Sequence, residues 1–178
     1  MKLIILDRDG VINEDSDDYI KSPDEFVPIA GSLAAIARLK QAGYTVVVAT
    51  NQSGVARGLF DIGTLNAIHE KLQRELARYG ASLDGMFFCP HGPADGCDCR
   101  KPKAGLLREI ATRFQVDLDC VPSIGDSLRD VEAAREVGAT PMLVKTGKGQ
   151  RTLDKHATEL RDVAVCDDLA HAVDLLVN

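Results

Sequence analysis

Short apolar runs alternate with segments of helical periodicity along the chain. Residues 2–6 (KLIIL) and 45–50 (TVVVAT) are rich in β-branched residues and are bounded by turn-forming residues. This pattern predicts two buried strands. Residues 86–89, 120–124 and 141–144 show shorter runs of the same kind and predict three further strands.

The segments between these strands carry apolar side chains at helical spacing. Two sets share one helical face each: Leu65, Ile68, Leu72 and Leu76, then Leu107, Ile110 and Phe114. Gly43, Gly80 and Gly138 follow helical segments at positions suited to a C-terminal cap. Repeated strand–helix alternation predicts an α/β fold: a Rossmann-like three-layer sandwich with a mainly parallel sheet.

Composition is consistent with this fold. The chain has 178 residues, 45% of them hydrophobic and 27% charged, so we expect a single domain over residues 1–178. The net charge of −6 disfavours nucleic acid as a partner. The apolar run near the N-terminus is too short for a signal peptide, and no run approaches the length of a membrane span. We expect a cytoplasmic monomer, in which clustered cysteines indicate a metal rather than disulfides.

Polar clusters follow four of the predicted strands. Asp7 and Asp9 lie in "DRDG", Thr50 opens "TNQSG", Lys101 follows the third strand, and Asp126 lies in "GDSLRD". Each stretch by itself is an ordinary turn. Because ligands bind at the carboxyl ends of strands in open α/β sheets, the combination predicts one site.

The chemistry of these side chains indicates a phosphoryl group. Carboxylates from Asp7, Asp9 and Asp126 are the oxygen ligands that Mg²⁺ prefers. Lys101 and the donors of Thr50 and Asn51 would balance the charge of a transferring phosphoryl group.

The loop after the third predicted strand holds four nitrogen and sulfur ligands: Cys89, His91, Cys97 and Cys99. A C-x-H pair followed after five residues by C-x-C predicts a closed tetrahedral zinc site. A zinc ion with four protein ligands has no open position, so we expect a structural zinc. It would fix the loop whose end carries Arg100 and Lys101.

The remaining cysteines and histidines carry no predicted function. Cys120 and Cys166 are interpreted as buried small residues. His69 and His156 are expected on the surface, and His171 is expected in a helix.

The four clusters resemble the four motifs of the haloacid dehalogenase superfamily of phosphohydrolases. The resemblance covers nearly the whole chain. It implies that Asp7 attacks phosphorus and becomes an aspartyl phosphate, and that Asp9 protonates the leaving oxygen and then activates water. The Asp9 backbone carbonyl and the Asp7 and Asp126 carboxylates would hold Mg²⁺.

The same resemblance implies that Thr50 and Lys101 stabilise the phosphoryl group, while Asp130 braces the motif loop. The gaps between motifs are too short for a separate cap domain, so we expect a capless member of the superfamily. Loops must then recognise the substrate, among them residues 13–28 and the zinc loop.

Within the superfamily the chain resembles the D-glycero-D-manno-heptose 1,7-bisphosphate 7-phosphatases and also the histidinol-phosphatases. The "TNQSGVARG" stretch and the additional cations Arg57 and Arg100 favour the heptose enzymes, because arginine suits a second phosphate. The five-residue spacing of the zinc loop and the acidic run 14–18 favour histidinol phosphate. The substrate is expected to be a small phosphorylated sugar, contacted by Asp15, Ser16, Asp17, Asp18, Asn51, Gln52, Ser53 and Arg100.

Three other classes fit less well. A zinc-loop binding module would not explain Asp7, Asp9, Lys101 and Asp126 at strand ends. A phosphotransferase usually needs a cap to keep water from the intermediate. A thiol redox protein would need C-x-x-C near a helix start, which the sequence lacks.

Overall fold

The computed structural model describes residues 1–177 and forms six strands and six α-helices over that range. The strands are β1 (Lys2–Leu6), β2 (Tyr44–Asn51), β3 (Gly85–Cys89), β4 (Pro122–Gly125), β5 (Thr140–Val144) and β6 (Ala164–Cys166). The helices are α1 (Ser32–Gln41), α2 (Ile62–Ala77), α3 (Gly105–Phe114), α4 (Leu128–Glu136), α5 (Gly149–Lys155) and α6 (Leu169–Val177), with a short 3₁₀ turn at Pro23–Glu25. None of the helices within residues 1–177 has the length and apolar character needed to span a bilayer.

All six strands pair in parallel in the order β3-β2-β1-β4-β5-β6, which confirms the predicted α/β fold. β1 lies at the centre, with β2 on one side and β4 on the other. The chain order reverses at this point, and such a switch point opens a crevice at the carboxyl ends of the strands. The Asp7 backbone N–H extends the pairing past β1 by donating to the Ile124 carbonyl at 2.9 Å.

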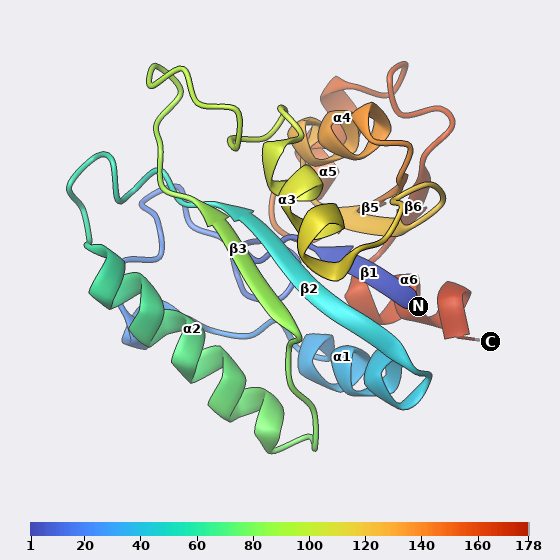
Figure 1. Ribbon diagram of the computed structural model, residues 1–178, viewed down its shortest axis with the longest axis horizontal. Helices are drawn as coiled ribbons and strands as arrows, with labels where there is room; N and C mark the ends of the chain where they lie inside the picture. The colour runs from blue at the N-terminus through green and yellow to red at the C-terminus, as the bar shows by residue number, and fades with distance from the viewer. Residues whose placement is uncertain (178) are drawn as a thin grey trace.

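Helices cover both faces of the sheet. α1, α2 and α6 pack on one face, and α3, α4 and α5 pack on the other (Figure 1). β1 is buried on both sides, because Ile4 and Leu6 join one core cluster while Leu3 and Ile5 join the other. A central strand buried on both faces reads as a continuous apolar run, which is why residues 2–6 were identifiable from sequence.

The structure corrects two predictions. Cys120 is exposed, not buried: β4 begins at Pro122, and Cys120 lies in the preceding turn with φ 61°. His69 is buried in α2 with 8% of its surface exposed, not on the surface. Cys166 is buried and His171 lies in α6, as predicted.

Candidate active site

A cavity of about 340 Å³ opens at the carboxyl ends of the strands. Its polar lining includes every predicted catalytic, phosphoryl-stabilising and magnesium-binding residue. The predicted residues that line it are Asp7, Asp9, Asp15, Ser16, Asp17, Thr50, Asn51, Gln52, Ser53, Arg100, Lys101 and Asp126. The fold therefore brings predicted residues as far apart in the sequence as Asp7 and Asp126 into one cavity.

Lys101 is held at the base of this cavity. Its Nζ donates to the Ala49 carbonyl at 2.7 Å and to Asp130 Oδ1 at 2.6 Å, and it lies 3.2 Å from Asp7 Oδ1. Burial raises the pKa of Asp7 to about 7, and the nearby Lys101 ammonium opposes that rise. Because Lys101 is only 4% exposed, its charge acts on Asp7 with little screening by water.

Asp130 braces the loop that carries Asp126. Its Oδ2 accepts from the backbone N–H groups of Asp126 and Ser127, at 3.2 and 3.0 Å, and from the Ser127 hydroxyl at 2.7 Å. Together with the Lys101 bond on Oδ1, these contacts occupy both carboxylate oxygens. Asp130 therefore braces this loop, as the resemblance implied, and of the carboxylates that cluster with it Asp7 and Asp126 keep oxygen atoms for a cation.

The carboxylates at this position fit a divalent cation. Oxygen atoms of Asp7, Asp126 and Asp130 all lie within 4.8 Å of one another, and the Lys101 ammonium contacts Asp7 and Asp130. Burial and the Asp7 charge raise the pKa of Asp126 to about 8. Three clustered carboxylates facing one ammonium leave an excess of negative charge, and a hard cation with oxygen ligands such as Mg²⁺ would neutralise it.

Two glycines allow Asp126 to occupy this position. Gly10 and Gly147 have positive φ values of 82° and 57°, and a Cβ atom at either residue would overlap the Asp126 carboxylate. The Lys148 backbone N–H donates to Asp126 Oδ2 at 2.8 Å, and the Thr146 hydroxyl donates to the Gly10 carbonyl at 2.6 Å. The turn after β1 and the turn after β5 therefore close around one carboxylate.

Asp9 has a different environment from Asp7. Its Oδ1 accepts from Arg8 Nε at 2.9 Å, from Arg8 Nη2 at 2.7 Å and from Asn13 Nδ2 at 2.9 Å, while Oδ2 accepts from Gln52 Nε2 at 3.1 Å. Burial raises the pKa of Asp9, but the Arg8 charge and these hydrogen bonds outweigh burial and hold the pKa below its usual value. The remaining Arg8 nitrogen, Nη1, lies 3.0 Å from His69 Nε2.

The hydroxyl–amide cluster at the end of β2 contacts the segments that follow the two neighbouring strands, β1 and β3. Gln52 Nε2 donates to Thr50 Oγ1 at 3.0 Å as well as to Asp9. Asn51 Nδ2 donates to the Lys101 carbonyl and Asn51 Oδ1 accepts from the Lys101 N–H, both at 3.0 Å. The Asn51 amide thus holds the Lys101 backbone, a positioning contact that the sequence did not predict.

Sequence reasoning missed several residues that line the cavity: Tyr19, Pro93, Ser127, Arg129 and Lys148. Arg129 lies within the "GDSLRD" stretch, and Lys148 lies shortly after the predicted strand 141–144, so their positions near strand ends were the available signal.

Two arginines were predicted from their charge to bind a second phosphate, and both line the cavity. The Arg57 guanidinium lies 5.7 Å from the centre of the Tyr19 ring. Burial and the nearby Arg129 charge lower the pKa of Arg100.

The acidic run 14–18 divides between cavity and solvent. Asp15 lies in the cavity wall, 3.5 Å from Lys148 Nζ, and Asp17 lies 3.3 Å from an Arg151 amino group. Asp18 is exposed and is absent from the cavity lining, so the geometry does not support its predicted contact with substrate.

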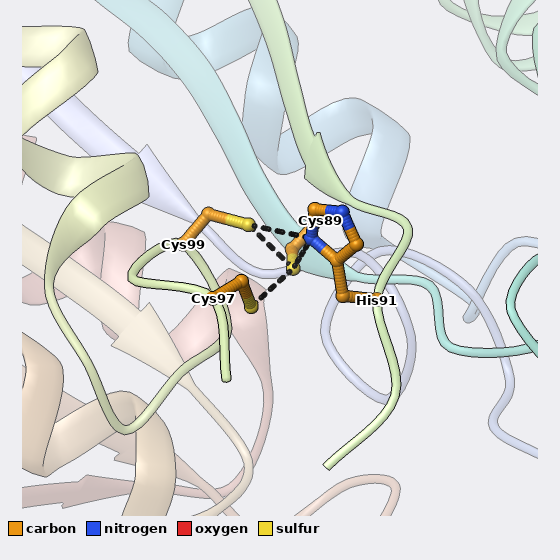
Figure 2. A group of neighbouring side chains, drawn as sticks. All are labelled: Cys89, His91, Cys97 and Cys99. Atoms are coloured by element: carbon orange, nitrogen blue, oxygen red, sulfur yellow. Dashed lines mark hydrogen bonds between the residues drawn. The ribbon is translucent and has the colours of Figure 1, made fainter. Parts of the chain in front are cut away.

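The four predicted zinc ligands point toward one another (Figure 2). Cys89 ends β3, while Cys97 and Cys99 return on the far side of the loop. Cys89 Sγ lies 3.6 Å from His91 Nδ1 and 3.7 Å from Cys97 Sγ, and His91 Nδ1 lies 3.4 Å from Cys99 Sγ. Zn–S bonds of about 2.3 Å in a tetrahedron give edges of roughly 3.5–3.8 Å, so these three separations fit a zinc ion. The Cys89–Cys99 edge is shorter, at 2.7 Å.

Comparison with known proteins separates the two substrate classes. A family model described as HAD-hydrolase-like matches residues 98–172. A D-glycero-beta-D-manno-heptose-1,7-bisphosphate 7-phosphatase from Bordetella bronchiseptica is 58% identical over 177 residues, which are 99% of this chain and 98% of that protein. The chain belongs to the heptose-1,7-bisphosphate 7-phosphatase family. A phosphatase of the same name from Pseudomonas aeruginosa is 55% identical over 98% of this chain and 97% of its own length.

Solved structures of the heptose bisphosphate phosphatase family share this fold. The B. bronchiseptica D,D-heptose 1,7-bisphosphate phosphatase, complexed with magnesium and phosphate, matches with a TM-score of 0.96 over 99% of this chain and 98% of its own. The Burkholderia thailandensis heptose bisphosphate phosphatase is 45% identical, with a TM-score of 0.77 and full coverage of both chains. These relatives do not support the histidinol-phosphatase alternative, and membership of a hydrolase family disfavours a non-catalytic zinc module.

Proposed function

We propose that the chain removes the C7 phosphate of D-glycero-beta-D-manno-heptose 1,7-bisphosphate in a magnesium-dependent reaction. The observation that carries this proposal is the 58% identity to the B. bronchiseptica phosphatase over almost the full length of both chains. The cavity supports the proposal independently, because it combines a nucleophile, an acid–base carboxylate and buried phosphate-balancing groups.

In the proposed mechanism Asp7 attacks phosphorus as the bond to the sugar O7 breaks, and Asp9 gives its proton to the leaving oxygen. Asp9 then takes a proton from water as that water displaces the Asp7 carboxylate. Lys101 and Thr50 balance the phosphoryl charge throughout. Asp7, Asp126 and the Asp9 backbone carbonyl would hold Mg²⁺, which supplies positive charge against carboxylate–phosphate repulsion when bound.

The distal phosphate requires its own cations. Arg100 and Arg129 both line the cavity, and they lie close enough that one charge lowers the pKa of the other. Two neighbouring guanidinium groups repel each other and would be stabilised by an anion between them. We assign the C1 phosphate to this pair, because the guanidinium fork matches phosphate oxygens.

The zinc ligands would hold a structural ion that stabilises the loop from Cys89 to Lys101. Four protein ligands leave no position for water, so this ion would take no part in hydrolysis. The loop determines where Arg100 and Lys101 enter the cavity, and zinc would therefore act on substrate binding through loop geometry. The proposed enzyme works as one domain over residues 1–178 on a small phosphorylated sugar.

Phosphate release from a defined panel tests the proposal. The panel contains the β anomer of heptose 1,7-bisphosphate, its α anomer, fructose 1,6-bisphosphate and histidinol phosphate, each with and without Mg²⁺. We expect the highest kcat/KM for the β heptose bisphosphate and loss of turnover when EDTA removes Mg²⁺. Preferential hydrolysis of histidinol phosphate or fructose bisphosphate would contradict the substrate assignment.

A further inference from the structure

Arg8 is a buried charge that the proposed mechanism does not use. It lies between Asp7 and Asp9 in the turn after β1, has 0% of its surface exposed and is absent from the cavity lining. All three of its guanidinium nitrogens have partners: Nε and Nη2 donate to Asp9 Oδ1, and Nη1 lies 3.0 Å from His69 Nε2. A fully buried arginine is costly unless each donor is satisfied, so this arrangement requires both partners.

The contact with Arg8 determines the protonation state of His69. Arginine stays protonated in proteins, so Nη1 donates and His69 Nε2 must accept. His69 is therefore neutral and carries its proton on Nδ1. Burial and the Arg8 charge lower the pKa of His69 to about 3, in agreement with this assignment. The Phe88 ring on β3 packs beside the His69 ring. The two ring centroids are 6.1 Å apart and the ring planes meet at 52°.

The Arg8 fork makes the two oxygens of Asp9 unequal. Oδ1 accepts three hydrogen bonds, two from Arg8 and one from Asn13, all at 2.9 Å or less. A proton on Oδ1 would have to face these three donors. Oδ2 has one contact, with the Gln52 amide at 3.1 Å, and an amide turned by half a rotation can accept as well as donate.

We propose that Arg8 and His69 are positioning residues that direct the transferable proton of Asp9 to Oδ2. The inference rests on the proposed function, in which Asp9 is the general acid and base. In the first step the proton on Oδ2 moves to the ester oxygen as the O–P bond breaks and the bond from Asp7 to phosphorus forms. In the second step Oδ2 takes a proton from water as the water oxygen binds phosphorus and the Asp7 oxygen leaves.

Two substrates with different leaving groups test the inference. A sugar alkoxide leaves poorly without a proton, whereas p-nitrophenolate leaves well without one. The value of kcat/KM reports the first irreversible step, which is transfer of the phosphoryl group to Asp7. A defect in proton delivery therefore lowers kcat/KM for heptose bisphosphate much more than for p-nitrophenyl phosphate. The ratio of the two values does not depend on the fraction of folded enzyme.

Three variants separate positioning from general structural damage. His69→Leu removes the acceptor, His69→Gln keeps an acceptor, and Asn66→Leu is a control on the exposed surface of the same helix, lining the same groove as His69. General acid catalysis contributes about 10²–10⁴-fold, so we expect His69→Leu to reduce the ratio roughly ten- to hundredfold. His69→Gln should stay within about threefold of wild type, and Asn66→Leu should not change the ratio.

Equal losses for both substrates in His69→Leu, or no recovery in His69→Gln, would overturn the inference. If His69→Leu yields no folded protein, Arg8→Lys replaces it, because a single ammonium cannot reproduce the fork and should give the same selective loss. Failure of the proposed function is distinguishable, since wild-type enzyme would then not hydrolyse the heptose bisphosphate.

Discussion

Lys101 and Asp130 form a buried ion pair, with Nζ 2.6 Å from Oδ1 and side chains that are 5% and 6% exposed. The pair joins the loop after β3 to the start of α4. It connects Lys101, which we propose balances the phosphoryl charge, to the residue that braces Asp126.

Replacement of Asp130 by alanine should destabilise the protein by about 3–5 kcal/mol, because Lys101 would stay buried with a weaker partner. Chemical denaturation monitored by circular dichroism measures this change. The exposed pair formed by Lys103 and Asp98, 3.7 Å apart, supplies the control: Asp98→Ala should cost less than about 1 kcal/mol. A similar cost at both sites would show that burial of the first pair has no energetic consequence.

Asp7→Asn should abolish magnesium-dependent hydrolysis while the protein stays folded, because the amide keeps the shape of the side chain but is not a nucleophile. Asp9→Asn should reduce kcat strongly and still permit phosphate binding. Phosphate release, with isothermal titration of inorganic phosphate, measures both properties. Substantial turnover by Asp7→Asn would exclude an aspartyl-phosphate intermediate.

Metal analysis of the purified protein should find about one zinc per chain, as expected for a closed site of four ligands. Cys99→Ser should lose this zinc, lower the melting temperature and raise KM, because the loop that carries Arg100 and Lys101 would loosen. Cys120→Ser is the matched control, since Cys120 is exposed and lies outside the cluster. Retention of wild-type stability and KM in zinc-free Cys99→Ser would contradict a bracing role.

Arg100→Ala should reduce kcat/KM for the bisphosphate roughly ten- to hundredfold, from a lost charge-assisted hydrogen bond of about 1.5–3 kcal/mol. Hydrolysis of p-nitrophenyl phosphate should change little, because that substrate has no second phosphate. Lys101→Ala should impair both substrates alike, and Arg78→Ala serves as an exposed-arginine control. If Arg100→Ala slows both substrates equally, Arg100 belongs to the reacting phosphate instead.

Much of the fold was predictable because the central strands are buried on both faces and read as continuous apolar runs. β6 was missed: it has three residues, Ala164–Cys166, too few to show a period. Cys120 was placed inside because the apolar run around Val121 extends before the true start of β4 at Pro122.

The positions of Asp7, Asp9 and Asp126 in one cavity were predictable because each closely follows a strand. The burial of His69 was also readable, since it lies four residues after Leu65 and three before Leu72, on the apolar face of α2. Its contact with Arg8 could not be predicted from the sequence, because the two residues are 61 positions apart and meet only through the packing of α2 on the sheet. The cation Arg129 was also missed, although it lies in "GDSLRD" shortly after β4 and enters the cavity from the first turn of α4.

The hydrogen bond between Thr146 and Gly10 spans 136 residues of sequence. During synthesis Asp7, which follows β1, leaves the ribosome long before the turn after β5 can close around Asp126. The elongating chain therefore carries Asp7 and Asp9 without the enclosure that holds the third carboxylate in place. Phosphatase activity should consequently appear late in translation, and a nascent chain arrested just before Thr146 should release no phosphate even though it contains β1 to β5.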